Sequence, residues 1–248
     1  MKWVRFGLVW GVGALGLLAT GCPNPNIYGT PRTTPKGKVS HTIAAETVGY
    51  RVDLNEDYED YEEVENSFEQ GFTMPTLPTY ILRVGIAERL DFGFRAANVA
   101  SSLGFDFKWN LVRSPVFDVA LDPMVQWAFA LDITHVHFPV LLGINASESF
   151  SVVLTPGIVY GYSDELEDID TDLSRVLATD GFSARMGVGF NVRISQGFAI
   201  QPEVTLIRSI QDHPDSEFDS VLMYVFGVGF NLANLPDFSD VDAAPATH

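Results

Sequence analysis

The sequence predicts an all-β fold, an antiparallel up-and-down β-barrel of about ten strands that spans a membrane. Three observations support this fold. Large apolar residues alternate with polar residues or glycine, the alternating segments are long, and tight turns alternate with long connections along the chain. Together they indicate a closed wall with one apolar face and one polar face.

The alternation is clearest over residues 103–111, in which every odd position is large and apolar and every even position is polar or glycine. Successive side chains of a strand point to opposite faces, so this segment forms a strand with one apolar face. The period of two does not say which face lies inside. Strands are expected at residues 37–50, 77–87, 90–99, 102–113, 116–129, 133–146, 149–162, 181–195, 197–209 and 219–232.

The lengths and connections of these strands favour a membrane barrel. Globular strands usually have about 5 to 6 residues, whereas a tilted membrane-spanning strand needs about 9 to 11. Tight turns follow every second strand, at residues 87–89, 113–115, 147–149 and 195–197. The long connections 51–76, 163–180 and 210–218 follow odd-numbered strands, which places them opposite the tight turns and both termini. Outer-membrane barrels show this asymmetry, and aromatic residues near the strand ends match their girdles.

Four prolines fall inside expected strands, where proline removes a ladder hydrogen bond. Pro123, Pro139 and Pro156 stand at similar distances from the tight turns, and Pro202 lies in a later strand. They predict a row of bulges or bends in the wall. A corner in a soluble two-sheet fold is the alternative.

The N-terminus has the pattern of a secretory signal peptide over residues 1–21, in which Lys2 and Arg5 flank the start of an apolar run that ends in small residues. Cys22, the only cysteine, follows directly. This arrangement resembles the lipobox of bacterial lipoproteins, although Ala19 stands where leucine is usual. The resemblance implies a lipid on Cys22, and the alternative is an ordinary signal peptide with an incidental cysteine.

The end of the last expected strand, residues 227–232, resembles the assembly signal of outer-membrane barrel proteins, although such signals usually end the chain. With the leader, it makes the chain similar to bacterial outer-membrane β-barrel lipoproteins over nearly its whole length, on architecture more than on diagnostic residues. The resemblance implies a bacterial outer-membrane location with a lipid anchor. It also implies that membrane lipids and the barrel assembly machinery are partners.

The chain divides into four expected regions: a signal peptide (1–21), a lipidated cysteine with a flexible tether (22–36), a β-barrel domain (37–232) and a mobile acidic tail (233–248). The tether is assigned from its proline, threonine and asparagine content. The net charge of −17 argues against nucleic acid as a partner. A single cysteine excludes an intramolecular disulfide.

The polar face, taken as the lumen, carries charges of both signs in similar number. Buried charges must pair, so this balance predicts a cross-linked interior rather than an open pore. The expected network consists of Arg83, Asp91, Arg95, Asp106, Lys108, Asp118, Asp122, Arg185, Arg193 and Glu203. Four glycines, Gly187, Gly189, Gly227 and Gly229, leave the inner wall bare, either for a slim ligand or for long arginines from opposite strands.

Two further patterns carry weaker chemical hypotheses. His135 and His137 lie two apart on one strand near Asp132, and Asp212 and His213 lie in another connection at that end. They could form a metal or acid–base site, or simply a satisfied polar network. The acidic stretches 53–69 and 164–172 could hold calcium, but the glycine of a calcium loop is absent, which favours a solvated acidic surface.

These observations predict a non-enzymatic outer-membrane barrel lipoprotein with acidic external loops and a structural, binding or narrow transport role. No catalytic motif, metal site or cofactor is expected, while a small ligand is compatible with the lumen. Two alternatives remain open: a lipid-anchored soluble lipocalin-like barrel that binds an apolar ligand, and an outer-membrane hydrolase with a His/Asp site at its rim. In the soluble alternative, Phe105, Phe107 and Trp109 line the cavity instead of facing lipid.

Overall fold

The computed structural model describes residues 24–54, 73–76, 78–97, 102–129, 132–163, 181–210 and 218–236. Among these residues, no helix is long and apolar enough to cross a membrane. The strands are β1 (Val39–Leu54), β2 (Thr73–Pro75), β3 (Thr79–Ala87), β4 (Leu90–Ala97), β5 (Ser102–Val112), β6 (Phe117–Leu121), β7 (Met124–Ala128), β8 (Ile133–Ser147), β9 (Phe150–Tyr162), β10 (Gly181–Ser195), β11 (Phe198–Ser209) and β12 (Phe218–Ala233).

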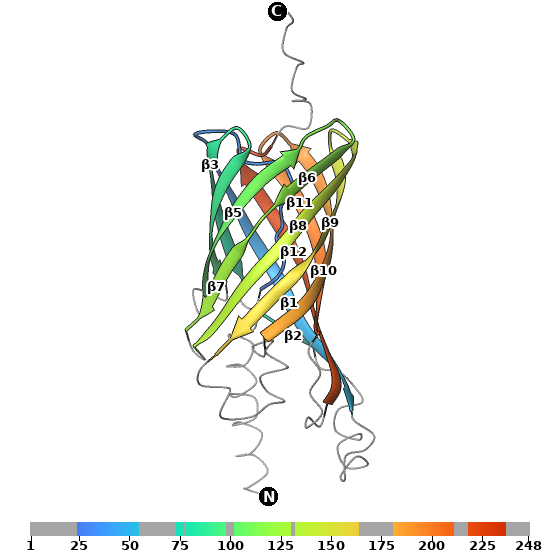
Figure 1. Ribbon diagram of the computed structural model, residues 1–248. Coiled ribbons are helices and arrows are strands. Elements are labelled where there is room, and N and C mark those ends of the chain that lie inside the picture. The colour runs from blue at the N-terminus through green and yellow to red at the C-terminus, as the bar shows by residue number, and fades with distance from the viewer. Residues whose placement is uncertain are drawn as a thin grey trace, which may run out of the picture.

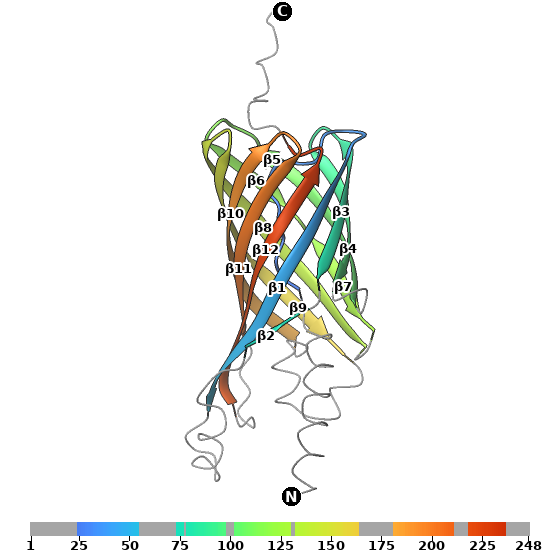
Figure 2. The same cartoon turned by 180° about the vertical axis from the view of Figure 1, so that it is seen from behind.

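The strands form one antiparallel sheet that closes on itself (Figure 1, and Figure 2 from behind). Neighbours along the wall follow chain order, and the pairing of β1 with β12 closes the barrel from Ser40 opposite Ala233 to Leu54 opposite Phe218. β6 and β7 succeed each other between β5 and β8, and β2 only borders β1, so 10 strands make the wall. The predicted up-and-down barrel is confirmed.

The two ends of the barrel differ, as the sequence predicts. Tight turns join β3 to β4, β5 to β6, β8 to β9 and β10 to β11 at one end, here named the tight-turn end. The strands that flank residues 55–72, 164–180 and 211–217 finish at the other, the long-loop end, and these residues lie outside the described part of the chain. The predicted acidic stretches, the signal peptide and Cys22 also lie almost wholly outside it.

The strand boundaries lie close to those expected from the alternation, with two differences. The expected strand 116–129 is split at Asp122 and Pro123 into β6 and β7, because Pro123 cannot donate a ladder hydrogen bond. Pro139, Pro156 and Pro202 remain inside β8, β9 and β11. β2 was not predicted, because its three residues have no alternation and are held only by backbone pairing with β1.

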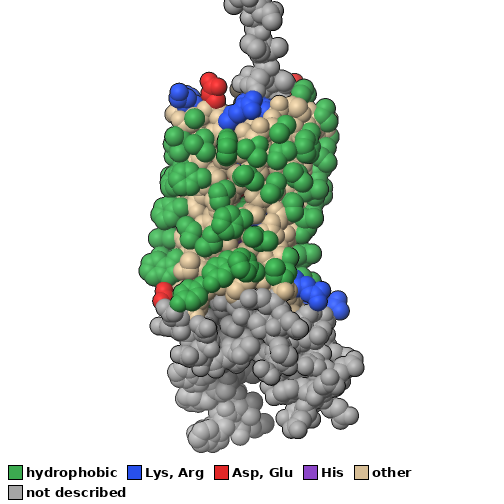
Figure 3. Space-filling model, in the orientation of Figure 1, with side chains coloured by type: hydrophobic (Ala, Val, Ile, Leu, Met, Phe, Trp, Pro, Cys, Tyr) green, Lys and Arg blue, Asp and Glu red, His purple; other side chains and the backbone are tan. Residues whose placement is uncertain are grey.

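The outer face of the wall is apolar. Phe105, Phe107 and Trp109 are 45%, 49% and 55% exposed, whereas the intervening Asp106 and Lys108 are buried in the lumen. On the face in Figure 3, hydrophobic side chains spread over the wall and charged ones gather at the two rims. Soluble proteins do not expose apolar surface on this scale, and a closed barrel leaves no strand edge unpaired in lipid. The barrel therefore spans a membrane, and the lipocalin-like alternative is wrong.

Aromatic side chains mark both borders of this apolar belt. Trp109, Phe117 and Phe150 face outward near the tight-turn end. Near the long-loop end the outward aromatics include Trp127, Tyr160 and Phe182, and the rings of the last two lie 5.0 Å apart. Such girdles sit at the two membrane interfaces of a barrel.

A charge placed inside the belt tests its contact with lipid. Phe105 faces outward between the two girdles, so we expect Phe105→Arg to lower the free energy of unfolding by about 2–4 kcal/mol, the usual cost of arginine near the bilayer midplane. Urea unfolding in phospholipid vesicles measures this change. Val116→Arg, in the exposed turn before β6, is the matched control and should change stability little. Equal effects of the two substitutions would contradict a lipid-facing belt.

The chain before β1 differs most from the sequence prediction. Residues 22–36 were expected to form a flexible tether, but the described part, residues 24–36, runs through the lumen, seen as the thin blue trace inside the wall in Figure 1. Asn26, Ile27, Tyr28 and Arg32 are at most 2% exposed. We name residues 24–36 the lumenal segment. It is extended, as its composition implies, but polar groups of the wall rather than water satisfy its backbone.

The predicted acidic tail begins with four described residues that close over the tight-turn end. The amide N–H of Ala233 donates to the carbonyl oxygen of Gly197 at 2.9 Å. The side-chain amide of Asn234 donates to the carbonyl oxygen of Val39 at 2.8 Å. Residues 237–248 lie outside the described part, so the mobility of the tail remains a prediction.

Candidate functional site

Wall side chains near the long-loop end hold the first residues of the lumenal segment. Gln126 of β7 accepts from the amide of Asn24 at 3.1 Å and donates to its carbonyl oxygen at 2.7 Å. Arg95 of β4 donates to the carbonyl oxygens of Asn24 and Asn26 at 3.0 and 2.6 Å. Arg185 of β10 donates to the carbonyl oxygen of Pro25 at 2.9 Å. Three strands of the wall therefore replace water around this backbone.

Two buried carboxylates hold the middle of the segment. Glu203 of β11 accepts from the amides of Ile27 and Tyr28 at 2.8 and 2.7 Å, one on each oxygen. Glu46 of β1 accepts the Tyr28 hydroxyl at 2.7 Å and the Asn24 side-chain amide at 2.8 Å. Each of these carboxyl groups therefore joins two groups of the segment to one strand of the wall.

Apolar contacts in the otherwise polar lumen match the segment as well. Ile27 packs with Ala120 of β6 and Leu141 of β8. Tyr28 packs with Ala44 of β1 and Ile81 of β3. Apolar residues on the inner face thus lie where the segment brings the buried side chains of Ile27 and Tyr28.

The last part of the segment is held near the tight-turn end. Arg32 makes an ion pair with Asp118 of β6 at 2.8 Å and donates to the carbonyl oxygen of Ser114. Asp91 of β4 accepts from the amide of Thr34 at 2.8 Å. Both ion-pair partners are fully buried, so removing one alone would leave an uncompensated charge.

A second ionic cluster belongs to the wall itself. Arg83 of β3 contacts Asp91 at 2.7 Å, Asp106 at 2.8 Å and Asp122 at 3.0 Å. Lys108 of β5 lies 3.5 Å from Asp91. The cluster links β3, β4, β5 and the break between β6 and β7. Asp91 belongs to both systems, because it also holds the lumenal segment.

Glycines on the inner wall make room for the segment. A Cβ at Gly229 would stand 2.8 Å from the Cβ of Tyr28, and one at Gly227 would overlap the Tyr28 hydroxyl. A Cβ at Gly143 would meet the Pro31 ring at 2.9 Å, and one at Gly85 would overlap the backbone of Thr34 and Pro35. The space beside Gly227 and Gly229, which the sequence suggested could hold a slim ligand, is thus filled by the chain's own lumenal segment. Gly187 instead faces threonines of neighbouring strands.

Filling one of these glycines should expel the segment. We expect Gly229→Leu to displace Tyr28 and to lower the free energy of unfolding by about 1–3 kcal/mol, as overpacking does. Gly187→Leu is the control on the neighbouring inner wall, where a Cβ meets the hydroxyls of Thr155 and Thr205 rather than the segment. Urea unfolding measures both variants, and adding Tyr28→Gly should rescue only the first. Absence of rescue would contradict direct packing between these positions.

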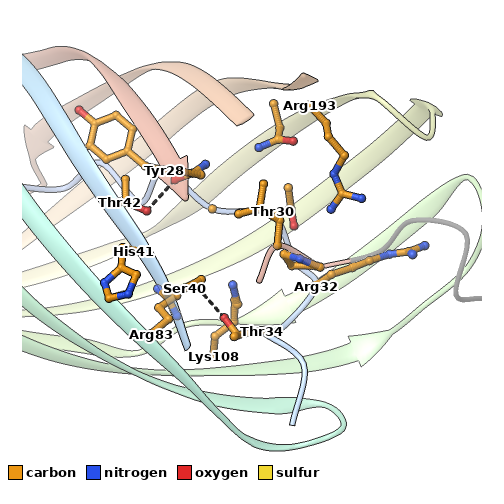
Figure 4. A pocket seen from close by; sticks show the side chains of 15 residues that line it. Tyr28, Thr30, Arg32, Thr34, Ser40, His41, Thr42, Arg83, Lys108 and Arg193 are labelled. Carbon is orange, nitrogen blue, oxygen red and sulfur yellow. Dashed lines mark hydrogen bonds between the residues drawn. The ribbon is translucent and has the colours of Figure 1, made fainter. Parts of the chain in front are cut away.

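A pocket lies between the segment and the wall, in the tight-turn half (Figure 4). It is lined by Tyr28, Gly29, Thr30, Arg32, Thr34, Ser40, His41, Thr42, Arg83, Lys108, Asn191, Arg193, Asn231, Leu235 and Pro236. Hydroxyl, amide and cationic groups dominate this lining. Its cationic groups include Arg32, which is paired with Asp118, and Arg83 and Lys108, which are paired with Asp91. The pocket is thus polar and unsuited to an apolar ligand.

The structure does not form the His/Asp rim site among the contacts of its described residues. His135 and His137 are buried in the lumen with ring centroids 6.1 Å apart. Asp132 is exposed and accepts from the indole of Trp127 at 2.8 Å, on the outer face. The described residues contain no group of His, Cys, Asp or Glu that could hold a metal ion. Asp212 and His213 lie outside the described part.

The predicted lumen network forms two systems that share Asp91. Arg83, Asp91, Asp106, Lys108 and Asp122 form the wall cluster, whereas Arg95, Arg185, Glu203 and Asp118 contact the lumenal segment. Arg193 lines the pocket. No sequence pattern pointed to Tyr28, Arg32, Glu46 or Gln126. The same holds for Gln201, whose side-chain amide donates to the carbonyl oxygen of Gly29 at 3.2 Å. The bare glycine wall was the one signal that pointed toward an occupant of the lumen.

No family profile and no curated protein sequence matches this chain. Solved structures similar to it include an outer-membrane channel from Pseudomonas putida F1, with a TM-score of 0.46, 9% identity and coverage of 85% of this chain and 99% of that one. They also include the outer membrane protease OmpT from Escherichia coli (0.41, 9%, 78% and 96%) and Ail from Yersinia pestis (0.33, 11%, 79% and 99%). Each of these three TM-scores lies below 0.5.

Proposed function

We propose that this protein is a bacterial outer-membrane β-barrel lipoprotein with a closed lumen and a structural or binding role. The single observation that carries the proposal is the burial of residues 24–34 inside the barrel, hydrogen-bonded to wall side chains along the segment. A channel needs a continuous water path through the lumen, and the lumenal segment occupies the space that such a path would need. This favours the structural or binding role over narrow transport.

The outer-membrane location and the lipid rest on different observations. Membrane-spanning barrels with short turns at one end and long connections at the other are typical of outer membranes. The leader that ends at Cys22 supports export and lipid attachment. The acidic stretches 53–69 and 164–172 belong to the long-loop end and would face outward in this orientation.

Membrane extraction tests the proposal. Cys22→Ala, exported with a conventional signal peptide, should remain in the carbonate-washed membrane pellet and shift in gel mobility on boiling, because the barrel rather than the lipid holds it. The wild-type protein should incorporate labelled palmitate, and Cys22→Ala should not. A soluble Cys22→Ala protein would overturn the membrane barrel, whereas a wild-type protein without palmitate would overturn only the lipid.

A further inference from the structure

The lumenal segment has a definite direction through the barrel. At its start, the side-chain amide of Asn24 donates to the hydroxyl of Thr79, the first residue of β3 at the long-loop end. At its finish, the amide of Gly37 donates to the carbonyl oxygen of Gly85, and Thr33 donates to that of Glu88 in a tight turn. The chain therefore passes from the long-loop end to the tight-turn end before β1 turns back, so the expectation that the N-terminal side starts at the tight-turn end is wrong.

The chain that precedes Asn24 cannot run back through the lumen, because the segment and the wall side chains leave no space beside residues 26–28. Asn26, Ile27 and Tyr28 are at most 2% exposed. The wall offers no side exit either, because β1 and β12 are paired along the seam from Ser40 to Leu54. The sequence that precedes Asn24 must therefore continue from the long-loop end.

We infer that the N-terminus of the mature protein, with the lipid on Cys22, is delivered on the long-loop side of the membrane. Cys22 lies outside the described residues, but it precedes Asn24 by two positions, and two residues span at most about 7 Å. Because the short turns of such barrels face the periplasm, the long-loop side is the cell surface. The acyl chains then enter the outer leaflet, opposite to an anchor that stays on the periplasmic side.

The lumenal segment also lies against the seam at which the barrel closes. The segment is enclosed by the wall, and Glu46 of β1 with Gly227 and Gly229 of β12 lies against Tyr28 at the seam. The segment therefore contacts both strands of the seam that closes the barrel.

The inference rests on the proposed outer-membrane barrel, and single cysteines can test the two separately. In a Cys22→Ala background, which has no other cysteine and is exported with a conventional signal peptide, three variants are compared: Pro23→Cys, Glu59→Cys in a long connection, and Glu88→Cys in a tight turn. A membrane-impermeant maleimide is applied to intact and to permeabilised cells. Only protein with the heat-shifted gel band is scored, so misfolded chains do not contribute.

We expect Pro23→Cys and Glu59→Cys to be labelled in intact cells, and Glu88→Cys only after permeabilisation. Labelling of Pro23→Cys only after permeabilisation, with Glu59→Cys labelled in intact cells, would overturn the inference and leave the barrel intact. Labelling of Glu88→Cys but not Glu59→Cys in intact cells would instead overturn the orientation in the proposed function. The inference would fall with it.

Discussion

Deleting residues 24–34 is expected to convert a silent barrel into a conducting one. The deletion removes the chain that fills the lumen and leaves the wall strands and their pairing unchanged. The freed partners, Glu203, Arg95 and Gln126, would then be solvated by water that enters the lumen. In planar bilayers the full chain should show no steady conductance, and the deletion variant should show discrete open-channel steps.

Two further variants make the result decisive. Deleting residues 237–248 shortens the chain by a similar length but spares the lumenal segment, so it should remain silent. If the first deletion does not assemble, Glu203→Ala with Arg95→Ala provides a second route, because it removes four hydrogen bonds to the segment and should give intermittent openings. A folded deletion variant that stays silent would contradict a lumen closed by this segment.

The largest loss of stability is expected from Arg83→Met. Arg83 contacts three carboxylates at 2.7–3.0 Å, while Lys108 is 3.5 Å from one of them. Removing Arg83 leaves an excess of buried negative charge, and breaking a buried ion pair from one side costs about 3–5 kcal/mol. Urea unfolding in vesicles, followed by tryptophan fluorescence, measures the loss.

A second substitution separates charge from packing in this cluster. Adding Asp106→Asn to Arg83→Met removes one of the uncompensated carboxylates and should recover part of the lost stability. Asp106→Asn alone leaves Arg83 with Asp91 and Asp122 and should cost less than Arg83→Met. A change below about 1 kcal/mol for Arg83→Met would mean that water already screens the cluster, as it does exposed pairs.

The wall could be predicted from the sequence because its pattern is local. In residues 103–111 a single period of two assigns each side chain to a face, and the structure places Phe105, Phe107 and Trp109 outside. The period of two does not say whether the apolar face points outward. The strand lengths and the alternation of tight turns with long connections predicted that it does. The break at Pro123 could also be anticipated, since proline cannot take part fully in the ladder.

The occupant of the lumen could not be predicted in the same way. Residues 24–36 have no periodicity. Their composition fits a tether in water as well as an extended chain whose polar groups bond to the barrel wall. Their contacts join positions far apart in sequence, such as Ile27 with Glu203 and Asn24 with Gln126. The bare wall at Gly227 and Gly229 showed that space exists there, but not which chain fills it.

The charge balance of the lumen was predictable, but its partners were not. Arg83 and its three aspartates were all identified as lumenal residues, yet Asp118 pairs with Arg32, which lies in the expected tether. Alternation fixes which face a side chain occupies. Register between strands, and the segment inside them, decides which partner it meets.

A disulfide between the segment and the wall tests the central claim most directly. A Cβ at Gly229 lies 2.8 Å from that of Tyr28, close enough for a bridge after a small adjustment, since disulfides prefer about 3.5–4.5 Å. In the Cys22→Ala background, Tyr28→Cys with Gly229→Cys should oxidise in the membrane and shift in a non-reducing gel. Thr42→Cys with Asn231→Cys, facing each other across the β1–β12 seam, is the control for a closed wall. If the seam pair oxidises while the Tyr28→Cys and Gly229→Cys thiols stay free, the segment is not in the lumen.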